Sequence, residues 1–198
     1  MKFPIANFLT LTRIAMIPVV VACFYLPYEW TSPAAAIAFI IAAITDSLDG
    51  YLARKLGQMT RLGAFLDPVA DKLMVATALI LLASHDVTPL RLIWFDPRIT
   101  VTIAAAVVIG REITISALRE WMAEIGARRK VAVSSLGKWK TILQMTGLSM
   151  MLFRENLFGL PVYELGLYCL LVAVVLTLWS MVVYLRAAWP DLRGSVDV

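Results

Sequence analysis

The sequence predicts an all-α polytopic membrane protein, a bundle of about six transmembrane helices with both termini on the cytoplasmic side. Of its 198 residues, 61% are apolar, and its mean hydropathy is +0.81. Both values exceed those of ordinary soluble domains. Basic residues, in addition, are distributed unevenly between the connections of the apolar runs. Residues 1–198 are therefore expected to form a single membrane domain.

Six apolar segments are taken as the membrane helices, because a bilayer requires roughly 20 apolar residues per helix. They are residues 5–26, 34–52, 63–83, 99–118, 140–153 and 161–187. The first is expected to be retained, because no small-residue cleavage site follows it. The fifth is short, so its helix is expected to begin as early as Ser135 or to continue to Asn156. The sixth carries no charged residue between Glu164 and Arg186, as a lipid-facing or packing helix would.

The basic residues set the orientation of the predicted bundle. One side of the membrane receives most of them: Lys2, Arg54, Lys55, Arg61, the run 128–130, Lys138, Lys140, Arg186 and Arg193. The other side receives Arg91, Arg98 and Arg154. Because cytoplasmic loops carry an excess of Lys and Arg, the termini and the connection after the second helix are expected on the cytoplasmic side.

Four carboxylates lie at the cytoplasmic ends of the second and third segments. Asp46 and Asp49 are about 60° apart on a helix, and Asp67 and Asp71 about 40° apart. Each pair therefore shares a helix face. A charged group inside a bilayer costs roughly 2.5–3.5 kcal/mol, so four of them together require a ligand or partners.

Two explanations for the carboxylates follow from the residues alone. Clusters of oxygen ligands suit hard divalent cations, Mg²⁺ first and Mn²⁺ next, whereas zinc would favour His or Cys. The only His is His85, and Cys23 and Cys169 lie far from the cluster in sequence. In the alternative, the acids form ion pairs with the cations nearby, namely Arg54, Lys55, Arg61 and Lys72. Two same-face pairs around a Gly-containing turn are more than such a network needs.

The pattern Asp46-x-x-Asp49-Gly50-x-x-Ala53-Arg54, followed after eight residues by Gly63-x-x-x-Asp67-x-x-x-Asp71, resembles the signature of the CDP-alcohol phosphotransferases. Every fixed position of the signature is filled. The resemblance implies that Asp46, Asp49, Asp67 and Asp71 hold a pair of divalent ions, Mg²⁺ or Mn²⁺. It also implies that Asp71 acts as the general base.

The first helix starts with Asn7-Phe8-Leu9-Thr10 and continues to Arg13, which by itself indicates a capped helix start with an interfacial Arg. A very similar Asn-x-x-Thr element helps to bind the CDP headgroup in the family. The resemblance therefore implies that CDP-diacylglycerol contacts Asn7, Phe8, Leu9, Thr10, Gly50, Ala53, Arg54 and Thr60. Gly50 would leave room for the substrate, Arg54 would clamp the diphosphate, and Thr60 would donate its hydroxyl.

Basic residues in and after the fourth segment are candidates for a phosphate site. Arg111 and Arg119 lie near two helical turns apart and roughly 80° in angle, so one face could present both. A snorkelling cation near a helix end is a better description of Arg119 than of Arg111. The connection that ends at Lys138 and Lys140 could bind anionic lipid headgroups, at about 1 kcal/mol per basic residue. The sharper interpretation places Arg111, Lys138 and Lys140 in one pocket for the phosphate of an acceptor.

Arg-Glu at residues 111–112, followed by Ile-Ser-Ala-Leu-Arg-Glu and by Gly-Lys-x-Lys-Thr at 137–141, most resembles the branch of the family that makes phosphatidylglycerophosphate. The resemblance implies transfer of the phosphatidyl group of CDP-diacylglycerol to glycerol 3-phosphate, with release of CMP. It further implies a homodimer. The protein is expected among the lipids of a bacterial inner membrane, and the basic residues place its active site at the cytoplasmic face. Nucleic acid is not expected as a partner.

Other functions stay open from the sequence. Within the same chemistry, the acceptor could be inositol phosphate or phosphatidylglycerol, whereas a phosphate pocket argues against serine. In a different class, the carboxylates could form the relay of a cation or proton transporter. A relay requires polar residues across the membrane, yet the second, third and sixth segments are almost purely apolar beyond the carboxylates. An enzyme with a site at half depth is therefore favoured.

Overall fold

The computed structural model describes the backbone of residues 5–56, 60–85, 96–127 and 135–193. This part of the chain forms six α-helices, as the apolar segments predict. They are α1 (Ile5–Tyr25), α2 (Thr31–Leu56), α3 (Arg61–Ser84), α4 (Pro97–Glu124), α5 (Ser135–Phe153) and α6 (Val162–Arg193). The all-helical fold class is confirmed.

The helices extend past several of the predicted segments. α4 continues to Glu124 and α6 to Arg193, and α5 begins at Ser135, the earlier of the two starts considered. Apolar composition marks only the part of a helix that lies in lipid. The backbone hydrogen bonds of a helix need no apolar side chains, so the helix continues into polar surroundings.

Polar side chains fix the starts of two helices. Thr60 precedes α3 and accepts a hydrogen bond from the backbone N–H of Gly63 at 2.9 Å. Asp96 precedes α4 and accepts one from the N–H of Arg98 at 2.8 Å, with Pro97 in the first turn. Such caps satisfy backbone donors that have no partner within the helix.

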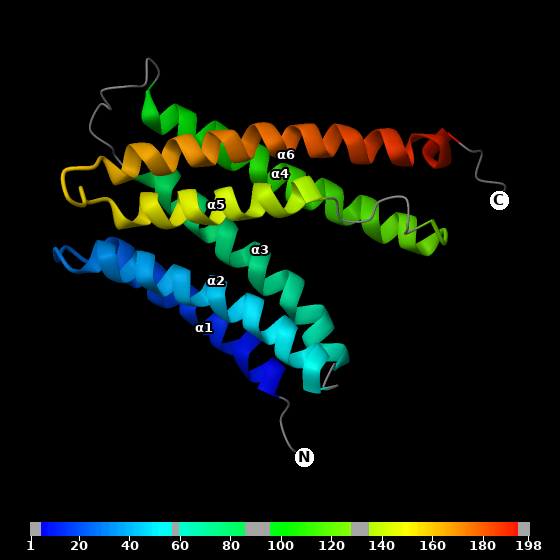
Figure 1. Ribbon diagram of the computed structural model, residues 1–198, viewed down its shortest axis with the longest axis horizontal. Helices are drawn as coiled ribbons and strands as arrows, with labels where there is room; N and C mark the ends of the chain where they lie inside the picture. The colour runs from blue at the N-terminus through cyan, green and yellow to red at the C-terminus, as the bar shows by residue number, and fades with distance from the viewer. Residues whose placement is uncertain (1–4, 57–59, 86–95, 128–134, 194–198) are drawn as a thin grey trace.

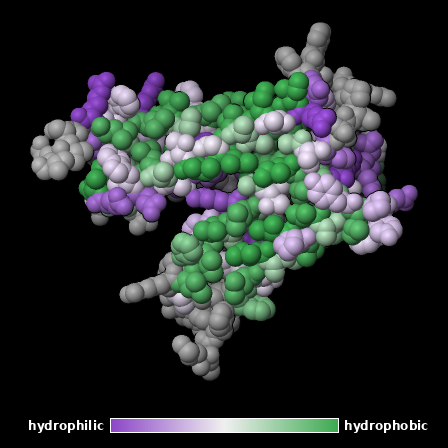
Figure 2. All heavy atoms as spheres, turned by 180° about the vertical axis from the view of Figure 1, so that it is seen from behind, coloured by the Kyte–Doolittle hydropathy of each residue, from purple (hydrophilic) through white to green (hydrophobic). Residues whose placement is uncertain are grey.

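Three described helices are long and apolar enough to cross a membrane: a segment of α1 (Phe8–Tyr25), α4 and α6. A shorter apolar stretch, Thr31–Asp46, lies in α2. Large apolar side chains are exposed along these helices, for example Ile103 and Val175, which are 59% and 66% exposed. Figure 2 shows that hydrophobic atoms cover much of one face. A surface of this composition suits contact with lipid, and the chain is an integral membrane protein.

The helices form two groups that α3 connects. α1 and α2 lie side by side, as do α5 and α6, and α4 packs against α3 and α6 (Figure 1). α3 runs diagonally between the two groups and contacts both α1 and α5. Buried apolar residues such as Phe39, Leu79 and Leu148 join the groups in one core. Hydrophilic side chains gather around a hollow between the two groups (Figure 2).

Two glycines allow α5 and α6 to approach at backbone distance. A Cβ atom at Gly147 would lie 2.7 Å from the carbonyl oxygen of Gly166, and one at Gly166 would lie 2.8 Å from that of Gly147. Real Cβ atoms essentially never come this close to a backbone oxygen. Small residues at a crossing are a common way for membrane helices to pack closely.

Candidate active site

Three of the four predicted carboxylates have described side chains, and α1 contacts two of them. The hydroxyl of Thr10 donates a hydrogen bond to Oδ1 of Asp67 at 2.5 Å. Nη1 of Arg13 forms an ion pair with Oδ1 of Asp46, also at 2.5 Å. Thr10 and Arg13 are three positions apart, so both project from one side of α1. The first helix thus joins the carboxylates of α2 and α3.

Arg13 is the member of this cluster that the sequence analysis missed. An interfacial Arg would reach water or lipid headgroups, but Arg13 is only 2% exposed. A buried guanidinium inside a membrane helix is costly unless a charge compensates it, and here Asp46 does. The sequence did contain one indication of this role, because Arg13 lies one helical turn after Thr10 in a mostly apolar segment. Arg13 therefore belongs to the charge balance of the carboxylates.

Of the cations named by the ion-pair alternative, Lys72 is the one whose side chain is described, and its hydrogen bond goes to α4. Lys72 donates a hydrogen bond to Oγ of Ser116 on α4, at 2.5 Å. The side chains of Arg54, Lys55 and Arg61 lie outside the described residues. Among the described side chains, Arg13 of α1 pairs with Asp46, and this alternative did not consider α1.

Asp71 lies where two charged regions meet. Towards α1 and α2, it interacts electrostatically with Asp46 and Arg13. Towards α4 and α5, it interacts with Glu112 and Lys140. The carboxylate predicted to be the general base is therefore in electrostatic contact with both regions.

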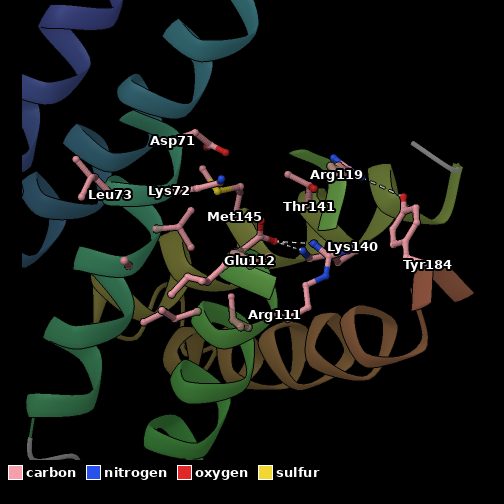
Figure 3. Close-up of a pocket in the computed structure, with 16 residues that line it drawn as sticks. Asp71, Lys72, Leu73, Arg111, Glu112, Arg119, Lys140, Thr141, Met145 and Tyr184 are labelled. Carbon is pink, nitrogen blue, oxygen red and sulfur yellow. Dashed lines mark hydrogen bonds and ion pairs between the residues drawn. The ribbon is translucent and has the colours of Figure 1, made fainter. Parts of the chain in front are cut away.

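A pocket of about 400 Å³ opens beside Asp71, between α3, α4, α5 and α6. Its charged lining consists of Asp71, Lys72, Arg111, Glu112, Arg119 and Lys140 (Figure 3). Among the described residues, four cations therefore face two carboxylates. Such an excess of positive charge favours an anion as the ligand of the pocket.

Glu112 holds the two most buried cations of the pocket. Its Oε1 accepts a hydrogen bond from Nη1 of Arg111 at 2.8 Å and another from Nζ of Lys140 at 2.5 Å (Figure 3). Arg111 is 8% exposed and Lys140 is 4% exposed. On its other side, Nη2 of Arg111 donates to Oγ of Ser180 on α6 at 2.9 Å. Three helices thereby fix these cations.

Arg119 lines the same pocket, two turns further along α4. Its Nη2 donates to the hydroxyl of Tyr184 at 3.2 Å, and its guanidinium lies 5.2 Å from the centre of that ring. Arg111 and Arg119 line one pocket, as their spacing of about two helical turns allows.

The structure brings some predicted binding residues to the site and leaves others untested. Arg111 and Lys140 line one pocket, and Thr10 reaches Asp67. Phe8 is 64% exposed, Leu9 is half-buried, and Thr60 caps α3. The side chains of Asn7, Asp49, Gly50, Ala53, Arg54 and Lys138 lie outside the described residues.

The carboxylates fit a hard divalent cation by their chemistry. The described side chains do not by themselves form a group of three or more His, Cys, Asp or Glu that could hold a metal ion. Asp46 and Asp67 each bind a residue of α1 through Oδ1, so each keeps a second oxygen. Ligands oriented in this way by neighbouring side chains are typical of metal sites.

The chain is similar to known proteins along nearly its whole length. A family profile described as CDP-alcohol phosphatidyltransferase matches residues 3–181. A protein of Escherichia coli (strain K12) is 51% identical over 192 residues, which cover 97% of this chain and 98% of the relative. Relatives from Shigella flexneri serotype 5b (strain 8401) and Salmonella choleraesuis (strain SC-B67) have the same identity and coverage. All three are named CDP-diacylglycerol–glycerol-3-phosphate 3-phosphatidyltransferase.

Proposed function

Because this chain belongs to the CDP-alcohol phosphatidyltransferase family, we propose that it transfers the phosphatidyl group of CDP-diacylglycerol to glycerol 3-phosphate. The products are phosphatidylglycerophosphate and CMP. The reaction is a step of phospholipid biosynthesis, and both the lipid donor and the lipid product explain why the enzyme is a membrane protein.

One structural observation carries the choice of acceptor: the positive charge of the pocket beside Asp71. Among its described lining residues, two carboxylates face four cations, namely Lys72, Arg111, Arg119 and Lys140. A phosphate monoester is a dianion at neutral pH, so it would neutralise this excess. Charge-assisted hydrogen bonds from Arg and Lys are the strong ones in phosphate recognition. Glycerol 3-phosphate supplies such a phosphate together with a hydroxyl that can react.

The transfer forms one bond and breaks another at the phosphatidyl phosphorus. The 1-hydroxyl oxygen of glycerol 3-phosphate attacks this phosphorus, and the bond to the CMP oxygen breaks. Asp71 accepts the proton of the attacking hydroxyl, because it lines the acceptor pocket and also faces the carboxylate cluster. Arg111 and Lys140 hold the acceptor phosphate and so orient its hydroxyl.

Asp46, Asp49, Asp67 and Asp71 would hold two divalent ions, Mg²⁺ or Mn²⁺. Such ions neutralise a diphosphate and stabilise the charge of its leaving oxygen. Thr10 and Arg13 orient Asp67 and Asp46 for this task. The remaining donor contacts are those the resemblance implies, namely Asn7, Phe8, Leu9, Gly50, Ala53, Arg54 and Thr60.

The cellular setting follows from the basic residues and the relatives. We place both termini and the charged site on the cytoplasmic side of the bacterial inner membrane, since most Lys and Arg flank that side. The diacyl tails of the donor would stay in the cytoplasmic leaflet while its headgroup reaches the carboxylates. A homodimer and a single domain over residues 1–198 complete the proposal.

The decisive experiment offers the purified protein CDP-diacylglycerol, Mg²⁺ and a panel of acceptors, and measures CMP release. The panel contains glycerol 3-phosphate, inositol phosphate, phosphatidylglycerol, serine and glycerol. We expect release with glycerol 3-phosphate that depends on the acceptor. Faster release with another member of the panel would identify that member as the acceptor. Absence of release with every acceptor would remove the transferase assignment.

A further inference from the structure

Glu112 pairs with two cations of the candidate acceptor pocket. Its Oε1 alone accepts hydrogen bonds from Nη1 of Arg111 and from Nζ of Lys140. These two donors are the buried cations that the proposed function assigns to the phosphate. A phosphate cannot use them fully while the carboxylate keeps both. When the phosphate binds, Arg111 and Lys140 must therefore either pair with both Glu112 and the phosphate or release Glu112.

Arg111 does not depend on Glu112 for its position. Its other terminal nitrogen, Nη2, donates to Oγ of Ser180, and that hydroxyl in turn donates to the carbonyl oxygen of Thr177 at 2.9 Å. Ser180 and Thr177 are both buried on α6. The hydrogen bond to Ser180 would therefore hold the guanidinium of Arg111 in place if Glu112 moved away.

Glu112 is the most exposed member of the group. The side chain of Glu112 is 30% exposed, whereas those of Arg111 and Lys140 are 8% and 5% exposed. Neighbouring positions on a helix point about 100° apart, so the side chains of Arg111 and Glu112 must bend towards each other to pair. The carboxylate of Glu112 is therefore more accessible to solvent than either cation.

We infer that Glu112 is an exchangeable counter-ion, which pairs with Arg111 and Lys140 until the phosphate of the acceptor replaces it. The inference rests on the proposed function for the identity of that phosphate. The chemical class it selects is a phosphate monoester, because a dianion compensates two buried cations better than one carboxylate does. An alcohol without such a group leaves Glu112 in place. Glu112 would then act as a specificity-determining residue.

Glu112→Gln tests the inference, because glutamine has the same shape and lacks the charge. A ligand that must displace an internal competitor binds more weakly by the fraction of sites that the competitor occupies. We therefore expect Glu112→Gln to lower the KM for glycerol 3-phosphate by about three- to tenfold. The matched control is Glu120→Gln, an exposed glutamate on the same helix, which should leave KM unchanged. Structural damage would not strengthen binding.

Inorganic phosphate provides a second measurement that needs no turnover. Its dissociation constant, measured by calorimetry on the purified full-length protein, should fall in Glu112→Gln and stay constant in Glu120→Gln. This result would support the exchange even if glycerol 3-phosphate proved not to be the acceptor. The failure of the inference and the failure of the proposed function are thereby distinguishable.

A weaker or unchanged affinity for phosphate in Glu112→Gln would overturn the inference, since Glu112 would then be a fixed part of the site. Glu112→Asp covers the case in which the first variant does not fold. It keeps the charge, but its shorter arm cannot reach both donors, so phosphate should again bind more tightly. If neither variant folds, Glu112 is a structural ion pair and the inference fails.

Discussion

The carboxylate cluster and the cationic pocket each contain a described residue of the opposite charge that forms ion pairs there, Arg13 and Glu112, and these two residues differ in burial. Arg13 pairs with Asp46 and is 2% exposed, whereas Glu112 pairs with Arg111 and Lys140 and has a side chain that is 30% exposed. A buried counter-charge cannot leave without a large desolvation cost. We therefore regard Arg13 as a permanent part of its cluster and Glu112 as a replaceable part of its pocket.

Removal of divalent ions should have the largest effect, because the proposed ions would supply most of the positive charge that the four carboxylates require. We expect no CMP release in EDTA and full recovery with Mg²⁺ or Mn²⁺. Full activity in the chelator would mean that cationic side chains of the protein balance the carboxylates. The proposed difference between the carboxylate cluster and the cationic pocket would then be wrong.

Asp71→Asn tests the residue that faces both regions. The substitution keeps the shape of the side chain but removes a base and an ion ligand. Loss of general-base catalysis alone should lower turnover by about 10²- to 10⁴-fold, measured as CMP release at saturating substrates. Circular dichroism should show an unchanged helix content. Turnover within threefold of the unchanged enzyme would remove Asp71 from the mechanism.

Arg111→Ala tests the cationic side separately. A charge-assisted hydrogen bond contributes roughly 1.5–3 kcal/mol, so the KM for glycerol 3-phosphate should rise by about ten- to a hundredfold. The KM for CDP-diacylglycerol should change little, and Arg186→Ala, an exposed Arg of α6, should change neither. A rise in the KM for the donor alone would place Arg111 in the donor site.

Arg13→Met should have the smallest effect of these changes. It tests most directly whether Arg13 balances the charge of the carboxylate cluster. It removes the buried cation but keeps a long apolar side chain. Without divalent ions, Tm should fall by roughly 2–4 °C for each 1 kcal/mol of lost stability. With saturating Mg²⁺ the difference should shrink, because the ions then neutralise Asp46. An equal loss of Tm with and without Mg²⁺ would show that Arg13 supports the fold and not the cluster.

The sequence allowed the helices to be predicted because each apolar segment is a local signal. The placement of Asp67 and Asp71 on one helix face likewise follows from their spacing alone. The predicted helix boundaries were less accurate. For example, α4 ends at Glu124, whereas the predicted segment ended at residue 118. A helix continues into water wherever its polar residues tolerate it, and hydropathy does not report this.

The two counter-charges were not predictable because each depends on helix packing. Arg13 lies on α1 and its partner on α2, and Glu112 reaches Lys140 only because α4 and α5 meet at the pocket. No spacing within one helix encodes either contact. The electrostatic contact of Asp71 with Asp46 has the same origin, since it depends on how α2 and α3 pack.

The glycine contact between α5 and α6 couples the stability of the bundle to its selectivity. A side chain at Gly147 or Gly166 would push the two backbones apart. Lys140 stands on α5 and Ser180, which anchors Arg111, stands on α6. Any widening of the crossing would therefore also change the distance between Lys140 and the anchor of Arg111. If these two cations bind the acceptor phosphate as proposed, a substitution at either glycine would alter the acceptor preference as well as the stability.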